Sequence, residues 1–329
     1  MTRAAVALDL GGTKTAGALV TSTGEVIARA EEPTPAKDGP DAVLDAVASV
    51  ARQLVGQAVD RGIDVRPILG IGSAGVINPH TGCVVSATPH IPGWTGTHLA
   101  ERLTERLADI PGRPIHTVRP INDVHAHALG EDMFRRNSGQ DSEGTTVLVA
   151  FGTGVGGAVL IDGKPQVGKH FVAGHVGMMP VPYHPEMDLF VPTAVDPEHL
   201  ILEDACAGAS FPRVYRTAGG TRDFATTRDL FAVAESDPVA QRVIRVSAEI
   251  AGSFLAGLAN ALDPDRLVLS GGLATAGPLW WEPMLRTYRH VRISGIETLP
   301  EPVSSGGAAA LLGAASLAWA DENPADPLS

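Results

Sequence analysis

The sequence predicts an α/β protein built from two related halves, and three observations lead to this fold class. A strand, a glycine-rich turn, a second strand and a tight turn occur in residues 4–24 and again in residues 145–163. The second copy follows the first after about 140 residues, which indicates an internal repeat. Elsewhere, short apolar runs alternate with stretches of helical periodicity, as in layered α/β folds.

In the first half, apolar runs broken by glycine and turn residues predict three strands before a proline-rich connector. These strands are expected at residues 4–10, 16–20 and 26–28. Asp41 is the expected N-cap of the following helix, whose apolar residues recur at helical spacing. The rest of this half is expected to contain a strand at 68–71, a helix at 99–107 and a strand at 115–121.

The second half repeats this beginning. We expect a strand at 145–151, a glycine loop at 152–157, a strand at 158–161 and a tight turn at Asp162-Gly163. Residues 180–197 are rich in proline and are expected to be irregular. Further along, we expect a helix that is capped by Asp237-Pro238 and runs to about Leu262, a strand at 266–270 and a closing helix at 306–319.

Composition excludes several classes of function. The 329 residues include 44% hydrophobic residues, enough for a packed core, and carry a formal charge of 25 − 37 = −12. A chain this acidic is not expected to bind nucleic acid or an anionic membrane. Its two cysteines, Cys83 and Cys206, cannot build a disulfide framework. No apolar stretch reaches the roughly 20 residues needed to cross a bilayer, so we expect a cytoplasmic protein.

The first glycine turn has the composition of a phosphate-binding loop. Gly11 and Gly12 let backbone N–H groups approach a phosphate chain, and Thr13 and Lys14 add a hydroxyl and a charge. Asp9, at the end of the preceding strand, is suited to hold Mg²⁺ directly or through water. The turn is not a Walker A loop, which has another glycine spacing and a following helix. An ordinary hairpin turn is the alternative.

The second glycine loop, at residues 152–157, satisfies GxGxxG, but a strand follows where a dinucleotide-binding site requires a helix. We therefore reject the dinucleotide reading. Gly271-Gly272, after a later strand, could lie against an adenine ring, although a plain Gly-Gly turn is equally consistent with the sequence.

Asn122-Asp123 is the third chemical feature. A carboxylate at the end of a strand, preceded by an amide, could accept the proton of a substrate hydroxyl. The alternative is that Asp123 only caps a helix. His125 and His127 lie two residues apart and do not face one another on a helix, so we do not expect them to form a metal pair.

Together, these segments resemble the ROK sugar kinases of the actin-like ATPase superfamily over nearly the whole chain. The matching segments, in order, are LDLGGTK, GIGSAGVINPHTG, PGWTGTHLAERL, INDVHAHALGE, FGTGVGGAVLIDGKPQVG, VLSGG and GGAAALLGAASLA. The resemblance implies duplicated ribonuclease-H-like (actin-like ATPase) domains with an interdomain active-site cleft. It also implies an N-terminal lobe of residues 1–121 plus 305–325 and a C-terminal lobe of residues 122–304.

The resemblance assigns roles to individual residues. Asp123 is the implied general base, and Asp9 belongs to the Mg²⁺ environment. The implied sugar contacts are Ser73, Gly75, His90, Asn122, Asp123, His175 and Glu203. The implied ATP contacts are Gly11, Gly12, Thr13, Lys14, Gly152, Thr153, Gly154, Gly271 and Gly272.

The sequence departs from the family where a structural zinc is usual. The family commonly has AGEIGH followed by a cysteine cluster, whereas this chain has AGHVGMM followed by the proline-rich residues 180–197. Met178 stands in the place of the zinc histidine, so we expect no structural zinc. His184, Glu186, Asp188 and His199 could form a substitute metal site, but we expect them to be solvated loop residues.

The sugar is indicated by few residues. His175 stands where glucokinase-like members have a glutamate, and the chain looks most like bacterial N-acetylmannosamine kinases. We therefore expect phosphorylation of a hexose or N-acetylhexosamine at the 6-hydroxyl, with N-acetylmannosamine as first choice and ATP and Mg²⁺ as cofactors. A glucokinase-type enzyme and a non-catalytic sugar-binding protein are the alternatives. A ROK transcriptional repressor is disfavoured, because no basic helix precedes the first motif. A homodimer is expected from the resemblance alone.

Overall fold

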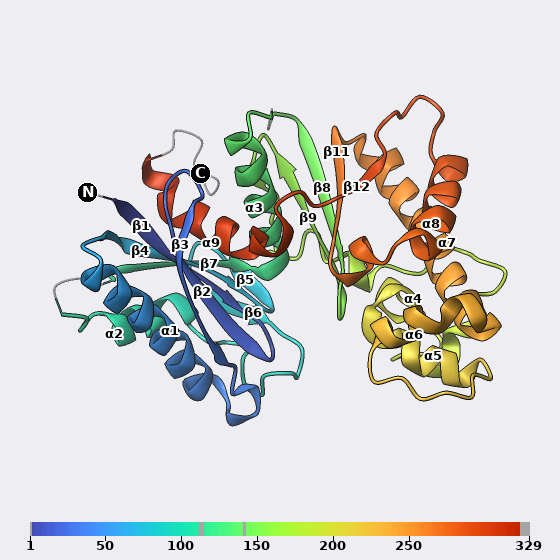
Figure 1. Ribbon diagram of the computed structural model, residues 1–329, viewed down its shortest axis with the longest axis horizontal. Coiled ribbons are helices and arrows are strands. Elements are labelled where there is room, and N and C mark those ends of the chain that lie inside the picture. Colours follow the sequence, from blue (N-terminus) through green and yellow to red (C-terminus); the bar gives the residue numbers. More distant parts are fainter. Residues whose placement is uncertain (1, 112–114, 141–142, 323–329) are drawn as a thin grey trace. The chain divides into compact units, whose positions relative to one another are not determined.

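The computed structural model describes residues 2–111, 115–140 and 143–322. These residues form two five-stranded sheets and a two-stranded ribbon, β5 (Val76–Asn78) with β6 (Cys83–Ser86). By its internal contacts the chain divides into two compact units (Figure 1). The first unit comprises residues 1–143, 159–173 and 304–329, and the second comprises residues 144–158 and 174–303.

The first sheet has the strand order β3-β2-β1-β4-β7. Its strands are β1 (Arg3–Leu10), β2 (Lys14–Val20), β3 (Val26–Pro33), β4 (Asp64–Ser73) and β7 (Thr117–Asn122). The antiparallel pairs β1–β2 and β2–β3 come from consecutive strands, while β1, β4 and β7 run parallel. The carboxyl ends of these three parallel strands therefore meet at one edge of the sheet.

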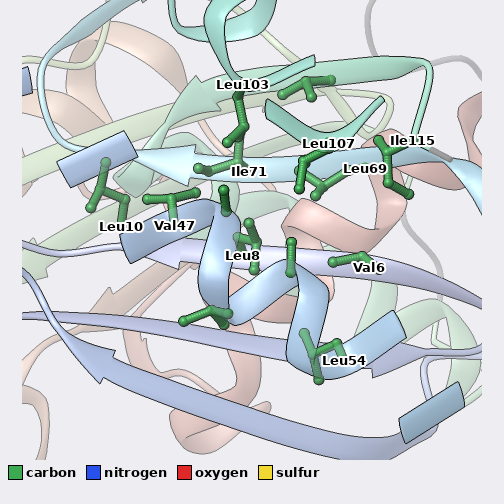
Figure 2. Close-up of a cluster of buried hydrophobic side chains, with 14 of the residues drawn as sticks. Val6, Leu8, Leu10, Val47, Leu54, Leu69, Ile71, Leu103, Leu107 and Ile115 are labelled. Atoms are coloured by element: carbon green, nitrogen blue, oxygen red, sulfur yellow. The ribbon is translucent and has the colours of Figure 1, made fainter. Parts of the chain in front are cut away.

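Helices cover both faces of this sheet, because successive residues of β1 point to opposite sides. Val6, Leu8 and Leu10 pack into a core with α1 (Pro40–Asp60) and α2 (Leu99–Leu107), as Figure 2 shows. The small residues Ala5 and Ala7 point the other way and pack against α9 (Ala309–Trp319). In β1, the large aliphatic side chains thus point to one face of the sheet, and Ala5 and Ala7 point to the other.

Helix α3 (Asp123–Asn137) lies against α9 with almost no space between the two backbones. A Cβ at Gly130 would overlap the carbonyl of Ala309, and a Cβ at Gly313 would overlap the carbonyl of Ala126. Neither glycine has a positive φ, so backbone conformation does not require glycine at these two positions. The close approach of the two helices does.

The second sheet has the order β10-β9-β8-β11-β12, which is the order of the first sheet repeated. Its strands are β8 (Thr145–Phe151), β9 (Val155–Ile161), β10 (Lys164–Pro165), β11 (Arg266–Ser270) and β12 (Pro300–Pro302). The expected duplication of an α/β unit is confirmed. At the β9–β10 turn, Asp162 and Gly163 have φ of 50° and 75°, as a two-residue type I′ hairpin requires.

Five helices belong to the second unit. They are α4 (Leu202–Cys206), α5 (Phe211–Thr217), α6 (Thr227–Val233), α7 (Pro238–Leu262) and α8 (Pro278–Val291). Helix α7 begins where the sequence predicts, with Asp237 accepting hydrogen bonds from the N–H groups of Val239 (3.0 Å) and Ala240 (3.2 Å). Among the described residues, no helix is long and apolar enough to cross a membrane.

Two local predictions are wrong. Asp41 is not the N-cap of α1, because the helix begins at Pro40 and Gly39 occupies the cap. Asp41 instead pairs with Arg102 and Arg106 of α2. The second glycine loop is shorter than expected, because β9 already begins at Val155.

The contact-based units also differ from the expected lobes. They place α3 with the first unit, because α3 packs on α9, whereas the sequence places a lobe boundary at residue 122. The lobe division remains a prediction.

Candidate functional site

In the first unit, the polar residues gather at the carboxyl ends of β1, β4 and β7. In the sheet register, Asp9 lies beside Gly72, and Ser73 lies beside both Leu10 and Asn122. This is the edge at which open α/β sheets place their ligand-binding groups. The strand register therefore explains why motifs more than a hundred residues apart in the chain come together.

Asn122 fixes the position of Asp123. Asn122 is the N-cap of α3 and accepts hydrogen bonds from the N–H groups of Val124 (3.0 Å) and His125 (3.4 Å). Its Nδ2 donates to the carbonyl of Gly75 (2.9 Å) and to Oδ1 of Asp123 (2.9 Å). Asp123 is thus the first residue of the helix rather than its cap, and its carboxylate is held by the neighbouring amide.

The environment of Asp123 raises its pKa. Burial is the largest cause and moves the pKa from 3.8 to about 6, although His127 and the hydrogen bond from the Val124 N–H (2.9 Å) act in the opposite direction. A partly buried carboxyl group with a pKa close to neutrality is what a general base requires.

Asp9 lies on the other side of Gly72 from Asp123. A Cβ at Gly72 would be 2.9 Å from Cβ of Ala126, 3.6 Å from Cα of Asp123 and 3.9 Å from Oδ1 of Asp9, so the glycine lets α3 pack closely against β4 beside the two acidic residues. Burial also raises the pKa of Asp9, while His127 and Lys14 lower it. Carboxylate oxygens are the ligands that Mg²⁺ prefers, so Asp9 fits the role of holding this ion.

The first glycine turn is held by its neighbours. The N–H of Gly11 donates to the Lys14 carbonyl (3.0 Å), and Oγ1 of Thr34 donates to the Gly11 carbonyl (2.9 Å). Lys14 is exposed and forms an ion pair with Glu31 on β3 at 3.0 Å. Thr34 was not singled out in the sequence, because a threonine in a proline-rich connector gives no signal.

The expected sugar contacts of this unit lie around the same edge. The ring Nε2 of His90 lies 3.2 Å from the carbonyl of Gly12. Gly75 has φ of 100°, which favours glycine, and its carbonyl accepts the hydrogen bond from Nδ2 of Asn122. Ser73 is fully buried, and its Oγ donates to the Ala74 carbonyl at 3.1 Å.

In the second unit, the shortened glycine loop lies against Glu203 of α4. The N–H of Val155 donates to Oε2 of Glu203 (2.8 Å), and a Cβ at Gly154 would be 2.6 Å from the same oxygen. Gly152 closes the loop by donating to the Gly154 carbonyl (2.9 Å). A predicted phosphate residue and a predicted sugar residue are therefore direct neighbours.

His175 and Gly271 are placed near this loop by close backbone contacts. Gly177, two residues after His175, approaches the Val155 carbonyl so closely that a Cβ would overlap it. Gly271 has φ of 84°, and a Cβ there would be 2.7 Å from the N of Gly152.

Two residues of this neighbourhood, Gly208 and Thr227, were missed in the sequence. The N–H of Gly208 donates to the Gly152 carbonyl (2.8 Å), and Thr227 Oγ1 donates to the carbonyl of Gly208.

The histidines and acidic residues outside these two groups have other partners. His199 pairs with Asp196 at 2.9 Å, and His184 pairs with Glu249 at 3.0 Å. In the part of the chain that the structure describes, no three His, Cys, Asp or Glu side chains are grouped to hold a metal ion. The expectation that zinc is lacking stays a prediction.

Comparison with known proteins now decides the family. The family model described as the ROK family matches residues 5–321. The chain belongs to the ROK family. Its fold class, predicted from the repeated strand pattern, is the one shared by ROK sugar kinases.

Curated ROK relatives include two kinds of sugar kinase. A glucokinase from Streptomyces coelicolor is 29% identical over 95% of this chain and 96% of its own length. An N-acetylmannosamine kinase from Escherichia coli is 30% identical over 82% of this chain and 84% of its own length. These relatives confirm the expected class, a sugar kinase, and leave the sugar to the proposal below.

A solved structure supports the same family. The crystal structure of a ROK family glucokinase from Streptomyces griseus, in complex with glucose and AMPPNP, superposes with a TM-score of 0.73 at 26% identity. It covers 95% of this chain and 98% of the other.

Proposed function

We propose that this ROK protein transfers the γ-phosphoryl group of ATP to the 6-hydroxyl of a hexose or N-acetylhexosamine, with N-acetylmannosamine as its sugar. The observation that carries the proposal is the partly buried Asp123, with its pKa near 6 and its carboxylate oriented by Asn122. The proposed reaction produces ADP and a sugar 6-phosphate.

The proposed reaction gives each of these residues a role. Asp123 accepts the proton of the sugar hydroxyl while the hydroxyl oxygen bonds to the γ-phosphorus in line with the departing oxygen of ADP. Asp9 would hold Mg²⁺, which would supply positive charge against the phosphates. The backbone N–H groups of the two glycine loops at Gly12 and Gly154 hold the phosphate oxygens, and Thr13 and Thr153 are assigned to the same contacts.

The acceptor sugar is proposed from His175. An imidazole in place of a carboxylate can donate or accept one hydrogen bond without adding a negative charge, and this suits an acyl-amino substituent better than a hydroxyl pair. Glu203, beside Gly154, is proposed to bind a second sugar hydroxyl. A glucokinase activity is the second candidate, favoured by the relatives of that name at nearly equal identity.

The proposal is tested by measuring ADP release from MgATP with N-acetylmannosamine, N-acetylglucosamine, glucose, mannose, fructose and allose. We expect selective turnover of N-acetylmannosamine. Selective turnover of glucose would keep the kinase and refute the argument from His175. Sugar binding without consumption of ATP would favour a non-catalytic sugar-binding protein. We also propose a cytoplasmic homodimer, which light scattering of the purified protein tests for its oligomeric state.

A further inference from the structure

Between His175 and Glu203 the chain forms an irregular loop, residues 180–201, whose two ends are hydrogen-bonded to one another. We call these residues the bracing loop. Pro180 and Ile201 form a β-bridge, and the N–H of Leu202 donates to the Met179 carbonyl at 2.8 Å. The bracing loop therefore starts five residues after one proposed sugar contact and ends directly before the α4 helix that carries the other.

The far end of the bracing loop is attached to α7. The backbone N–H of Glu186 donates to Nδ1 of His184 (3.0 Å), so His184 carries its proton on Nε2, which donates to Oε2 of Glu249 (3.0 Å). The carboxylate of Glu186 accepts from Arg242 and from Arg245, each at 2.6 Å. Both arginines lie on α7.

The attachment is a network rather than a set of separate pairs. Arg245 bridges both glutamates, because it also donates to Glu249 at 2.8 Å, and Arg286 of α8 donates to the remaining oxygen of Glu249 at 3.1 Å. All four carboxylate oxygens thus have partners. The two arginines lower the pKa of Glu186. Networks of this kind hold geometry better than isolated surface ion pairs do.

The returning part of the loop is tied to α4 next to Glu203. Asp204 is nearly buried and accepts hydrogen bonds from the N–H groups of Val195 and Ile201, each at 3.1 Å. Displacement of the loop therefore acts on the residue that follows Glu203 in the helix.

We propose that the network of His184, Glu186, Arg245 and Glu249 positions Glu203 for sugar binding through the bracing loop. This inference rests on the proposed function, because it gives Glu203 a sugar to bind. Two members of the network, His184 and Glu186, lie in the proline-rich segment, and the other two, Arg245 and Glu249, lie on α7.

The test compares Glu186→Gln with a matched control, Asp223→Asn. The control removes an acid from an exposed ion pair of the same unit, Arg216–Asp223 at 3.4 Å. For Glu186→Gln we expect faster hydrogen exchange across residues 180–201. We also expect sugar affinity, measured by calorimetry, to weaken by about tenfold while the KM for ATP is unchanged. The control should match the wild type in all three measurements.

Three results with the variants would overturn the inference. Unchanged hydrogen exchange across residues 180–201 in Glu186→Gln would show that the network does not hold the bracing loop. Faster exchange with unchanged sugar affinity would show that the network holds the loop but does not position Glu203. Full additivity of Glu186→Gln and Arg245→Gln in sugar affinity would show that the two residues do not act together. Failure of the proposed kinase activity can be told apart from failure of this inference, because a non-catalytic sugar-binding protein would still lose sugar affinity in Glu186→Gln. A wild type that binds no sugar would overturn both.

Discussion

Replacing Asp123 by asparagine is expected to abolish turnover and at the same time to stabilise the fold. Asparagine keeps an oxygen that can accept from Val124 and Asn122, so the hydrogen bonds at the start of α3 survive. What disappears is the cost of ionising a partly buried, poorly hydrated carboxyl group, which raises the Asp123 pKa from 3.8 to about 6.

The size of the gain depends on pH in a defined direction. The folded pKa of Asp123 lies above the unfolded value, so the folded wild type binds the proton more tightly and its stability falls as pH rises from about 4 through about 6. The variant has no group that titrates here. Its advantage in free energy of unfolding is therefore about 0.6 kcal/mol at pH 4, about 1.6 kcal/mol at pH 5 and about 3 kcal/mol at pH 8.

Urea unfolding of both proteins at pH 5, 6.5 and 8 measures this difference directly, alongside an ADP-release assay at pH 8. Asp223→Asn, at an exposed carboxylate, is the control and should show no comparable pH-dependent gain. A gain that does not change with pH, or a loss of stability at pH 8, would refute the reasoning from burial. Wild-type turnover in Asp123→Asn would refute the assignment of the general base.

Four further predictions follow from the same structure. In the wild type, kcat/KM for the sugar should fall about tenfold per pH unit below a pH of about 6. Because His127 lowers the Asp123 pKa, His127→Ala should move this acidic side of the pH profile to higher pH. An unchanged profile would show that His127 does not act on Asp123. Glu131→Gln should lower the free energy of unfolding by about 3 kcal/mol, because Glu131 is buried and accepts from Arg135 and two backbone N–H groups; thermal melts with an unchanged midpoint would contradict this. Gly130→Ala should lower the free energy of unfolding by about 3 kcal/mol, because the added methyl group would overlap α9. The matched control is Gly257→Ala, at an open position of α7, which should not lower the free energy of unfolding. His175→Glu should shift preference from N-acetylmannosamine toward glucose, and equal losses for both sugars would count against a selective role.

Short-range patterns made the architecture predictable. The strand–glycine–strand repeat is written in neighbouring residues, and the capping of α7 by Asp237 follows from a local hydrogen-bond rule. The same local rule failed at Asp41, where Gly39 and Pro40 start the helix and the aspartate finds two arginines in another helix instead.

The candidate site was predictable only where a motif marked it. Gly72 was overlooked, because its importance is the close approach of Ala126 on α3 beside Asp9 and Asp123, and only the register of three strands brings these residues together. The network around Glu186 was likewise read as solvated loop residues. Its partners on α7 are more than 50 residues away in the chain, and no local pattern indicates such a pairing.

The contact between α3 and α9 has a reciprocity that bears on the origin of the chain. Gly130 faces Ala309 and Gly313 faces Ala126, so each helix offers the other a glycine and a carbonyl in exchange. Such mutual contacts are the mark of an isologous interface, the kind that a two-fold axis generates between identical subunits. Each helix also follows the last strand of its own five-stranded sheet. The reciprocal contact of α3 with α9 therefore accords with an origin of the chain by duplication of one strand–helix unit.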